Sequence, residues 1–451
     1  MRVNTRRYGA HIGLRARLAL RRWSRRAVFL LGGIAVGGAA VSMAKLADRA
    51  QAAFLWLIDQ FPYIGLAVTP LGFGLASVLA RDCFPNSQGS GIPQAIAALH
   101  IAEQERRAPL VSLRVAGGKI VVMTLGLLCG ASIGREGPTV QVGAAIMFAL
   151  GRFSPYRQAG FLLAGAAAGV AAAFNTPLAG IVFGIEEMSR SFESRTSGLI
   201  IGAVIAAGLT AMSLLGDYSY FGTTNATLPL GESWVAILVC AIAGGLMGGL
   251  FIRIVALFAG GAPGGLGRVI RSYPILFAMI CGLGVAICGL HGDASVFGTG
   301  YSQARQVVHA DGPVDYWFAP LKFAATAISA ISGIPGGVFS PSLAVGAGLA
   351  SALSLLFHSV PLGALALVGM VSYLAGVVQA PITSFVIVSE MTNDHAMIIP
   401  LMAAALIADG ASKLLSREGL YHLLSKNFRP PPGEARSQAA DQRAGLEGTP
   451  A

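Results

Sequence analysis

A carboxylate and a guanidinium, Glu136 and Arg135, stand together inside an otherwise apolar run from Gly130 to Gln141. The glycine-rich break followed by Pro138 predicts the start of a helix, because proline suits the first helical turn and glycine permits the turn leading into it. Glu136 would then lie beside free amide groups of a helix N-terminus, where a dissolved anion could take its place. A capping carboxylate paired with Arg135 on a surface loop is the alternative. At membrane depth, ionisable groups generally serve function, so the stretch predicts competition between carboxylate and anion.

Three loops share this design, in which glycine-rich backbone precedes a helix. They are Gly89-Ser90-Gly91-Ile92-Pro93, Gly134-Arg135-Glu136-Gly137-Pro138 and Gly336-Gly337-Val338-Phe339-Ser340-Pro341. Exposed N–H groups in such loops carry partial positive charge. Because conduction requires a site that also releases its ion, partial charges suit anion transport better than a full lysine or arginine charge.

The composition identifies the elements that hold these loops. Of 451 residues, 54% are hydrophobic and only 12% are charged, and the mean hydropathy is +0.67. Apolar segments near or above the ~20 residues of a spanning helix recur along the chain, which predicts an all-α membrane protein. No HExxH motif or metal-ligand spacing occurs, so we expect neither an enzyme nor a metal site.

Charge is concentrated at the start of the chain. Residues 1–26 hold nine arginines and no acidic residue, within a net charge of +11. The positive-inside rule predicts a basic cytoplasmic tail over 1–26, and residues 426–451 read as a second, disordered cytoplasmic tail. A cleaved signal peptide is the alternative for the first segment. Anionic lipid is a simpler partner for these arginines than nucleic acid, which we do not expect to bind.

An internal repeat divides the membrane domain, 27–425, into halves of roughly 52–215 and 233–416. At an offset of 203 residues, Lys119 aligns with Lys322 and Pro138 with Pro341. Farther on, Pro177 lies near Pro381, and Glu187-Met188 is set against Glu390-Met391. Duplicated transporters bind substrate between their repeats, at broken helices whose N-termini face anions. The charged residues 101–114 are expected to form a loop.

The three loops, in this order, resemble the filter motifs of the CLC family of chloride channels and chloride/proton exchangers. The resemblance extends to residues 171–188 and to Gly419-Leu420-Tyr421-His422, so it covers about 80–426. It implies an inverted repeat of many tilted and partly broken helices, in a homodimer whose subunits each have a pore. It also implies an inner-membrane, multi-pass protein without added regulatory domains, and no cofactor beyond bound chloride ions.

The resemblance also assigns roles to single residues. The central anion would be bound by the hydroxyls of Ser90 and Tyr421 and by the backbone N–H groups of Val338 and Phe339. Glu136 matches the gating glutamate and Glu187 the inner proton-transferring glutamate, with its neighbour Glu186 as the competitor. Each role has a plainer alternative, such as a helix N-cap for Ser90 and an interfacial position for Tyr421.

The function that this resemblance implies is chloride transport coupled to proton antiport. The alternative is a passive chloride channel with the same filter, and a cation-coupled solute permease is a further one. Gln94 and Ile96 leave the inner proton path with fewer acidic groups than many exchangers have. Lys119 and Lys322 would either add positive potential near the pore or extend toward an interface.

Overall fold

The computed structural model describes residues 5–101, 103–152, 158–189, 197–216, 219–224, 226–228, 232–260, 264–292 and 294–429, with side chains from residue 26 onward except at 197, 232 and 266. Helices make up this structure, and its β pairing is limited to two isolated bridges among the described residues. The tail expected to be disordered, 426–451, is wrong in its first residues, because Lys426–Phe428 form a 3-10 turn, and from 430 onward it lies outside the described residues. The expected basic tail is described only as helical backbone from Thr5.

The helices of the first half are α1 (Thr5–Gln60), α2 (Gly65–Val78), α3 (Ile92–His100), α4 (Gln104–Val111), α5 (Leu113–Leu128), α6 (Glu136–Gly151), α7 (Gln158–Phe174), α8 (Pro177–Phe183) and α9 (Ser197–Leu215), with π-helical turns η1 (Leu79–Cys83) and η3 (Gly184–Ser189). Those of the second half are α10 (Glu232–Ala259), α11 (Gly264–Ser272), α12 (Pro274–His291), α13 (Tyr301–Val308), α14 (Phe318–Ile331), α15 (Phe339–Leu353), α16 (Leu362–Val378), α17 (Pro381–Thr392), α18 (Ile398–Lys413) and α19 (Leu420–Ser425), which ends in the 3-10 turn η4 (Lys426–Phe428).

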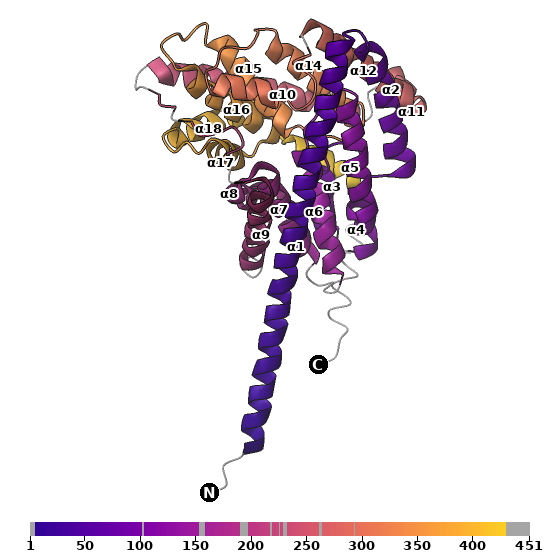
Figure 1. Ribbon diagram of the computed structural model, residues 1–451, viewed down its shortest axis with the longest axis vertical. Helices are drawn as coiled ribbons and strands as arrows, with labels where there is room; N and C mark the ends of the chain where they lie inside the picture. The colour runs from indigo at the N-terminus through magenta and orange to yellow at the C-terminus, as the bar shows by residue number, and fades with distance from the viewer. Residues whose placement is uncertain are drawn as a thin grey trace.

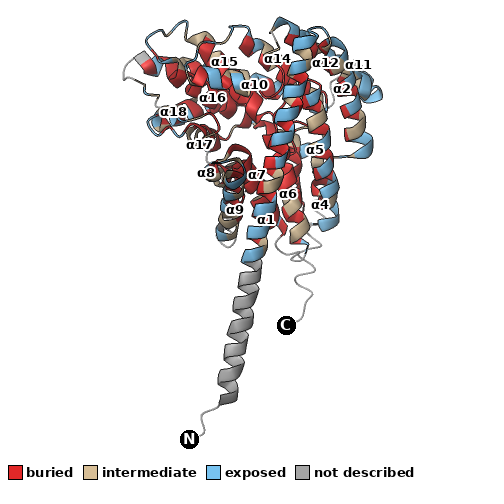
Figure 2. Ribbon diagram, viewed as in Figure 1, coloured by how far each residue is buried: buried red, intermediate tan, exposed pale blue. Residues whose placement is uncertain are grey.

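Six described helices are long and apolar enough to cross a membrane. Other apolar helices, including α7, α14, α15 and α16, have 14–17 residues and are shorter than a full span. In α16 every residue from Gly363 to Val378 is buried, as Figure 2 shows. The apolar stretches therefore build a protein interior at membrane depth as well as a surface facing lipid.

The two halves repeat the same order of helices. Helices α5 to α9 correspond to α14 to α18, and α1, α2 and α3 correspond to α10, α12 and α13. In Figure 1 most second-half helices gather at one end of the molecule, beyond α3 to α9. Residue 52, where we expected the first half to begin, falls inside α1, so that half starts earlier in the chain.

Two reciprocal contacts show that the halves face each other around an approximate two-fold axis. The Glu390 carboxylate accepts hydrogen bonds from the N–H groups of Leu178 (3.0 Å) and Ala179 (2.8 Å), at the start of α8. Glu186 does the same for Ile382 (3.1 Å) and Thr383 (2.6 Å), at the start of α17. Each half thus caps a helix of the other half.

This exchange corrects the repeat alignment. Glu390 corresponds to Glu186 and not to Glu187, because Pro177 and Pro381 each open the helix concerned and lie 204 residues apart. Asn175 and Gln379, also 204 apart, both have left-handed backbone, with φ of 58° and 56°. The expected loop at 101–114 is also wrong: α4 covers 104–111, and the Arg107 side chain is buried.

Close backbone approach fixes the main helix crossing of each half. A β-carbon added at Gly143 of α6 would collide with the carbonyl oxygen of Gly165 of α7, and one at Gly165 would collide with that of Gly143. Gly346 and Gly369 repeat this relation between α15 and α16. Glycine is required at both crossings because membrane helices gain their association energy from close packing.

We expect Gly165→Ala to destabilise the protein, since the added carbon forces α6 and α7 apart. Overpacking of this kind costs about 1–3 kcal/mol. The apparent unfolding temperature in detergent measures the effect. Gly117→Ala on α5 is the matched control, because no described atom lies within 4 Å of a β-carbon added there. Equal unfolding temperatures for the two variants would contradict this account of the crossing.

Candidate functional site

Three helix N-termini meet in the interior of the protein, where the glycine-rich loops pair with one another. The Gly134 N–H donates to the Gly337 carbonyl at 2.7 Å, and the Gly337 N–H donates back at 2.8 Å. Gly89 is joined in the same way to the loop before α15, through Ile334 (3.2 Å) and Gly336 (3.0 Å). These bonds hold the starts of α3, α6 and α15 together.

None of these three N-termini has a side-chain cap. The N-cap residues are Gly91, Arg135 and Val338, and none of these three makes a side-chain hydrogen bond to the first-turn amides of α3, α6 or α15. The first amides of a helix have no acceptor within the helix, and they carry the positive end of its dipole. Their common location is therefore a place where negative charge is stabilised.

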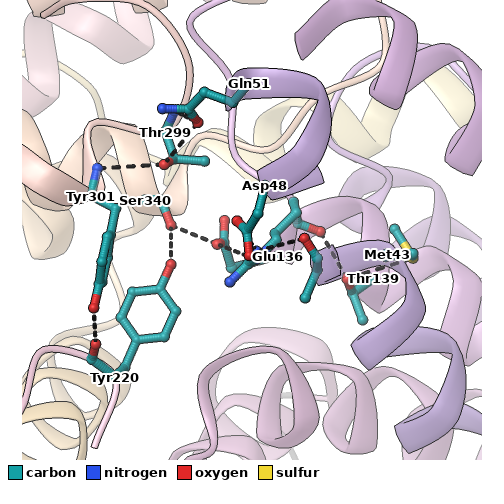
Figure 3. A network of polar contacts seen from close by, with 11 residues as sticks. Met43, Asp48, Gln51, Glu136, Thr139, Tyr220, Thr299, Tyr301 and Ser340 are labelled. Atoms are coloured by element: carbon teal, nitrogen blue, oxygen red, sulfur yellow. Dashed lines mark hydrogen bonds and ion pairs between the residues drawn. The ribbon is translucent and has the colours of Figure 1, made fainter. Parts of the chain in front are cut away.

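Glu136 lies at this place and is fully buried, with 0% of its surface exposed. The Ser340 hydroxyl donates to its Oε1 atom at 2.6 Å, across the boundary between the two halves (Figure 3). A β-carbon at Gly134 would collide with Oε2. The carboxylate thus occupies a fitted position among backbone groups, and a surface-loop position for Glu136 is excluded.

Ser90 and Tyr421 lie in the same region, and their buried hydroxyls are close enough to interact with each other. A β-carbon at Gly137 would collide with Ser90 Oγ, which places this hydroxyl at the start of α6. Tyr421 interacts electrostatically with both Glu136 and Glu187. Two hydroxyl donors next to each other at the start of α6 fit an anion site, because each could donate to the same anion.

These positions decide two of the plainer alternatives. Ser90 does not cap a helix: Gly91 is the N-cap of α3, with left-handed backbone at φ 93°. Tyr421 is 0% exposed and cannot be an interfacial residue. Its ring stacks on Phe339 with the centroids 5.7 Å apart.

Phe339 and Val338 stand where α15 begins. Val338 is the N-cap and Phe339 the first residue of the helix, and both are buried. Beside Tyr421, the Phe339 ring packs against Phe174 and Phe183, at centroid distances of 6.0 and 6.2 Å. The rings line the site, while the amides at the start of α15 provide its polarity.

Arg135 points away from this group, toward α1. Its Nη1 atom binds Asp48 Oδ1 at 2.6 Å and the Ala44 carbonyl at 3.0 Å, while its Nε lies 4.0 Å from Glu136 Oε1. Arg135 and Asp48 line a pocket of about 330 Å³ with Lys45, Tyr220, Thr299 and Tyr301. The chief partner of Arg135 is therefore Asp48, and the pocket gives the site a partly cationic vestibule.

Two members of this network, Asp48 and Tyr220, are absent from the expected site residues. The Tyr220 hydroxyl lies 3.4 Å from Ser340 Oγ, and its carbonyl accepts from the Tyr301 hydroxyl at 2.7 Å (Figure 3). An acidic residue in the apolar sequence of α1 is a signal that could have identified Asp48. Tyr220 lies in the connection between α9 and α10, and only the folded chain brings it to Ser340.

Glu186 and Glu187 have separate surroundings, as adjacent residues of a helical turn must. Glu186 caps α17, whereas the Glu187 side chain is 2% exposed and points toward α19. Its Oε1 atom lies 3.7 Å from Nε2 of His422. Both glutamates belong to η3, and π-helical turns are frequent at functional sites.

Lys119 and Lys322 are both fully buried, and neither reaches an interface. Lys119 Nζ binds the Gly89 carbonyl at 2.8 Å, and Lys322 Nζ binds the carbonyls of Val296 and Gly298, each at 2.8 Å. Each lysine thus holds the glycine loop that precedes a short helix of its own half. Lys119 supports the loop that carries Ser90.

Comparisons with known proteins agree with this architecture. The family model for the voltage gated chloride channel matches residues 72–413. The H(+)/Cl(−) exchange transporter ClcA of Yersinia pestis is 30% identical, with alignment over 93% of this chain and 90% of the relative. ClcA of Klebsiella pneumoniae is 31% identical, with alignment over 85% of this chain and 84% of the relative.

Solved structures share the fold. A slow cyanobacterial Cl−/H+ antiporter superposes with a TM-score of 0.78 and 24% identity, over 90% of this chain and 98% of that one. A CLC-type fluoride/proton antiporter has a TM-score of 0.73 and 20% identity, over 90% of this chain and 98% of that one. The chain therefore belongs to the CLC family of chloride channels and chloride/proton exchangers, which are transport proteins and not enzymes.

Proposed function

We propose that this protein exchanges chloride for protons across the membrane, with Glu136 as the gate and outer proton acceptor. One observation carries the proposal: the Glu136 carboxylate is buried at the common location of three uncapped helix N-termini. The relatives named as H(+)/Cl(−) exchange transporters support the pair of transported ions.

The coupling follows from competition for one place. Chloride bound beside the Ser90 and Tyr421 hydroxyls and the amides of Val338 and Phe339 repels an ionised Glu136 and favours its protonation. Protonation in turn removes the negative charge that competes with chloride. Any such coupling free energy is reciprocal, so a chloride gradient drives protons and a proton gradient drives chloride.

The inner end of the proton path is assigned to Glu187. Its side chain is only 2% exposed and lies 3.7 Å from His422, whereas Glu186 caps α17. A passive chloride channel is the alternative function, in which Glu187 would carry no protons. A reversal potential that does not respond to the pH gradient would favour the channel.

We also propose a homodimer in the inner membrane with both termini in the cytoplasm. The arginines of residues 1–26 support this orientation. Helices α8 and α17 expose Leu178 (55%) and Ile382 (50%) beside the carboxylates of Glu390 and Glu186. Carboxylates are costly against lipid, so a second subunit covers this mixed face better than acyl chains do.

Replacing the gate tests the first assignment. The amide side chain of Glu136→Gln cannot take up or release a proton. We therefore expect proton flux to be lost while chloride flux continues. Chloride and pH electrodes used together on reconstituted vesicles measure both fluxes. Proton uptake at the wild-type rate would refute the role of Glu136.

Replacing the inner glutamate tests the second assignment, which gives Glu187 the inner end of the proton path. Glu187→Gln should leave chloride flux that no longer drives protons. The matched control is Glu186→Gln, one residue away, which keeps Glu187 and should keep coupling. If both variants acidify the vesicles equally under a chloride gradient, Glu187 is not on the path.

Ser340 should set how strongly the gate competes with chloride. A hydrogen bond to a charged group contributes about 1.5–3 kcal/mol, and part of this is recovered when neighbouring amides rebind the carboxylate. We therefore expect Ser340→Ala to tighten chloride binding about three- to tenfold in calorimetric titrations near neutral pH. Ser342→Ala, a buried serine of the same helix, should leave the Kd unchanged. Unchanged binding in Ser340→Ala would show that this bond does not hold the gate.

A further inference from the structure

We propose that His422 is a proton-relay residue, which takes the proton from Glu187 and passes it to water on the cytoplasmic side. The inference rests on the proposed role of Glu187 and adds the step that follows it. The first observation is distance: His422 Nε2 lies 3.7 Å from Glu187 Oε1. One bridging water or a small side-chain rotation reduces this gap to hydrogen-bond length.

The second observation is burial. Only 2% of the Glu187 side chain is exposed, against 11% of the His422 side chain. A proton on Glu187 therefore has little direct access to water, whereas the imidazole next to it has some. His422 thus lies next to the buried carboxylate and is the more exposed of the two groups.

The third observation is the surroundings of α19. Just beyond His422, Lys426 Nζ binds Glu418 Oε2 at 2.5 Å, with 58% and 42% of the two side chains exposed. Such exposed charges mark a region in contact with water. His422 thus lies on a helix that carries the buried Tyr421 and is flanked by an exposed ion pair.

Other titratable groups lie on the elements that pack most closely on α19. Among the described side chains these are His100 (α3), Cys240 and Arg253 (α10), Tyr373 (α16) and Lys426 (η4). His100 is exposed and contacts the carbonyl of Ile96, and Lys426 pairs with Glu418. Arg429 donates to Ser425 Oγ, whose own hydroxyl donates to the carbonyl of His422 and not to its ring.

The chemistry is a pair of proton transfers. Protonated Glu187 gives its O–H proton to Nε2 of a neutral imidazole that carries its hydrogen on Nδ1, which leaves a carboxylate and an imidazolium. The imidazolium then loses a proton to water, and the reverse sequence loads Glu187. Histidine suits this step because its ordinary pKa lies close to physiological pH.

The relay also bears on a feature of the sequence. Gln94 and Ile96 stand on α3 where more acidic surroundings were expected of an exchanger, and α3 packs against α19. A histidine directly after Tyr421 supplies a titratable group from the other side of the path. Proton exchange with the cytoplasm then requires no carboxylate on α3.

The test uses the full-length protein in vesicles, with chloride and pH electrodes together. His422→Gln keeps polar side-chain atoms but cannot relay a proton, so we expect proton flux to fall about tenfold or more while chloride flux continues. His422→Glu restores a titratable group and should recover proton flux. His100→Gln, which replaces the exposed histidine of α3, is the matched control and should couple like the wild type.

Each result separates the relay from the proposed function. Proton loss in Glu187→Gln together with wild-type proton flux in His422→Gln overturns the relay and leaves the antiporter assignment intact. Wild-type proton flux in Glu187→Gln overturns both. If His422→Gln does not reconstitute, His422→Ala with added imidazole replaces it: recovery of proton flux by imidazole supports the relay, and no effect of imidazole overturns it.

Discussion

The structure depends on unpaired amide groups gathered at one buried place. Helices α3, α6 and α15 begin there without side-chain caps, so their first N–H groups require a negative partner from elsewhere. Leaving such groups unsatisfied at membrane depth is costly, and a permanently bound cation or anion would block transport. The Glu136 carboxylate lies buried at this place and accepts from the Ser340 hydroxyl, and in the proposed mechanism a proton removes its charge and makes it replaceable by an anion.

Duplication explains how a single chain assembles this arrangement. The Gly134 and Gly337 loops exchange backbone hydrogen bonds, and Glu186 and Glu390 exchange helix caps, so each half completes the other. The site itself is not symmetric. Glu136 comes from the first half and its Ser340 partner from the second, so one half supplies the carboxylate and the other the hydroxyl that holds it in place.

The buried polar groups divide into those that hold the backbone and those that the proposed mechanism uses to carry protons. Lys119 and Lys322 are fixed by loop carbonyls, Arg135 by Asp48 and Ala44, and Glu186 by α17. Glu136 and Glu187 both interact electrostatically with Tyr421. The proposed proton route connects these two carboxylates and so passes the anion site.

The sequence by itself determined the membrane class, the duplication and the three glycine loops, because hydropathy, proline and glycine act locally and leave a readable pattern. It did not determine which of two adjacent glutamates belongs to the repeat or that 104–111 is helical, since a one-residue shift and a short polar helix leave little signal. Only the tertiary structure placed Ser340 on Glu136, Asp48 on Arg135 and His422 beside Glu187. Those pairs join residues 204, 87 and 235 positions apart in the chain, and contacts at such separations are set by how whole helices pack, which no local pattern encodes.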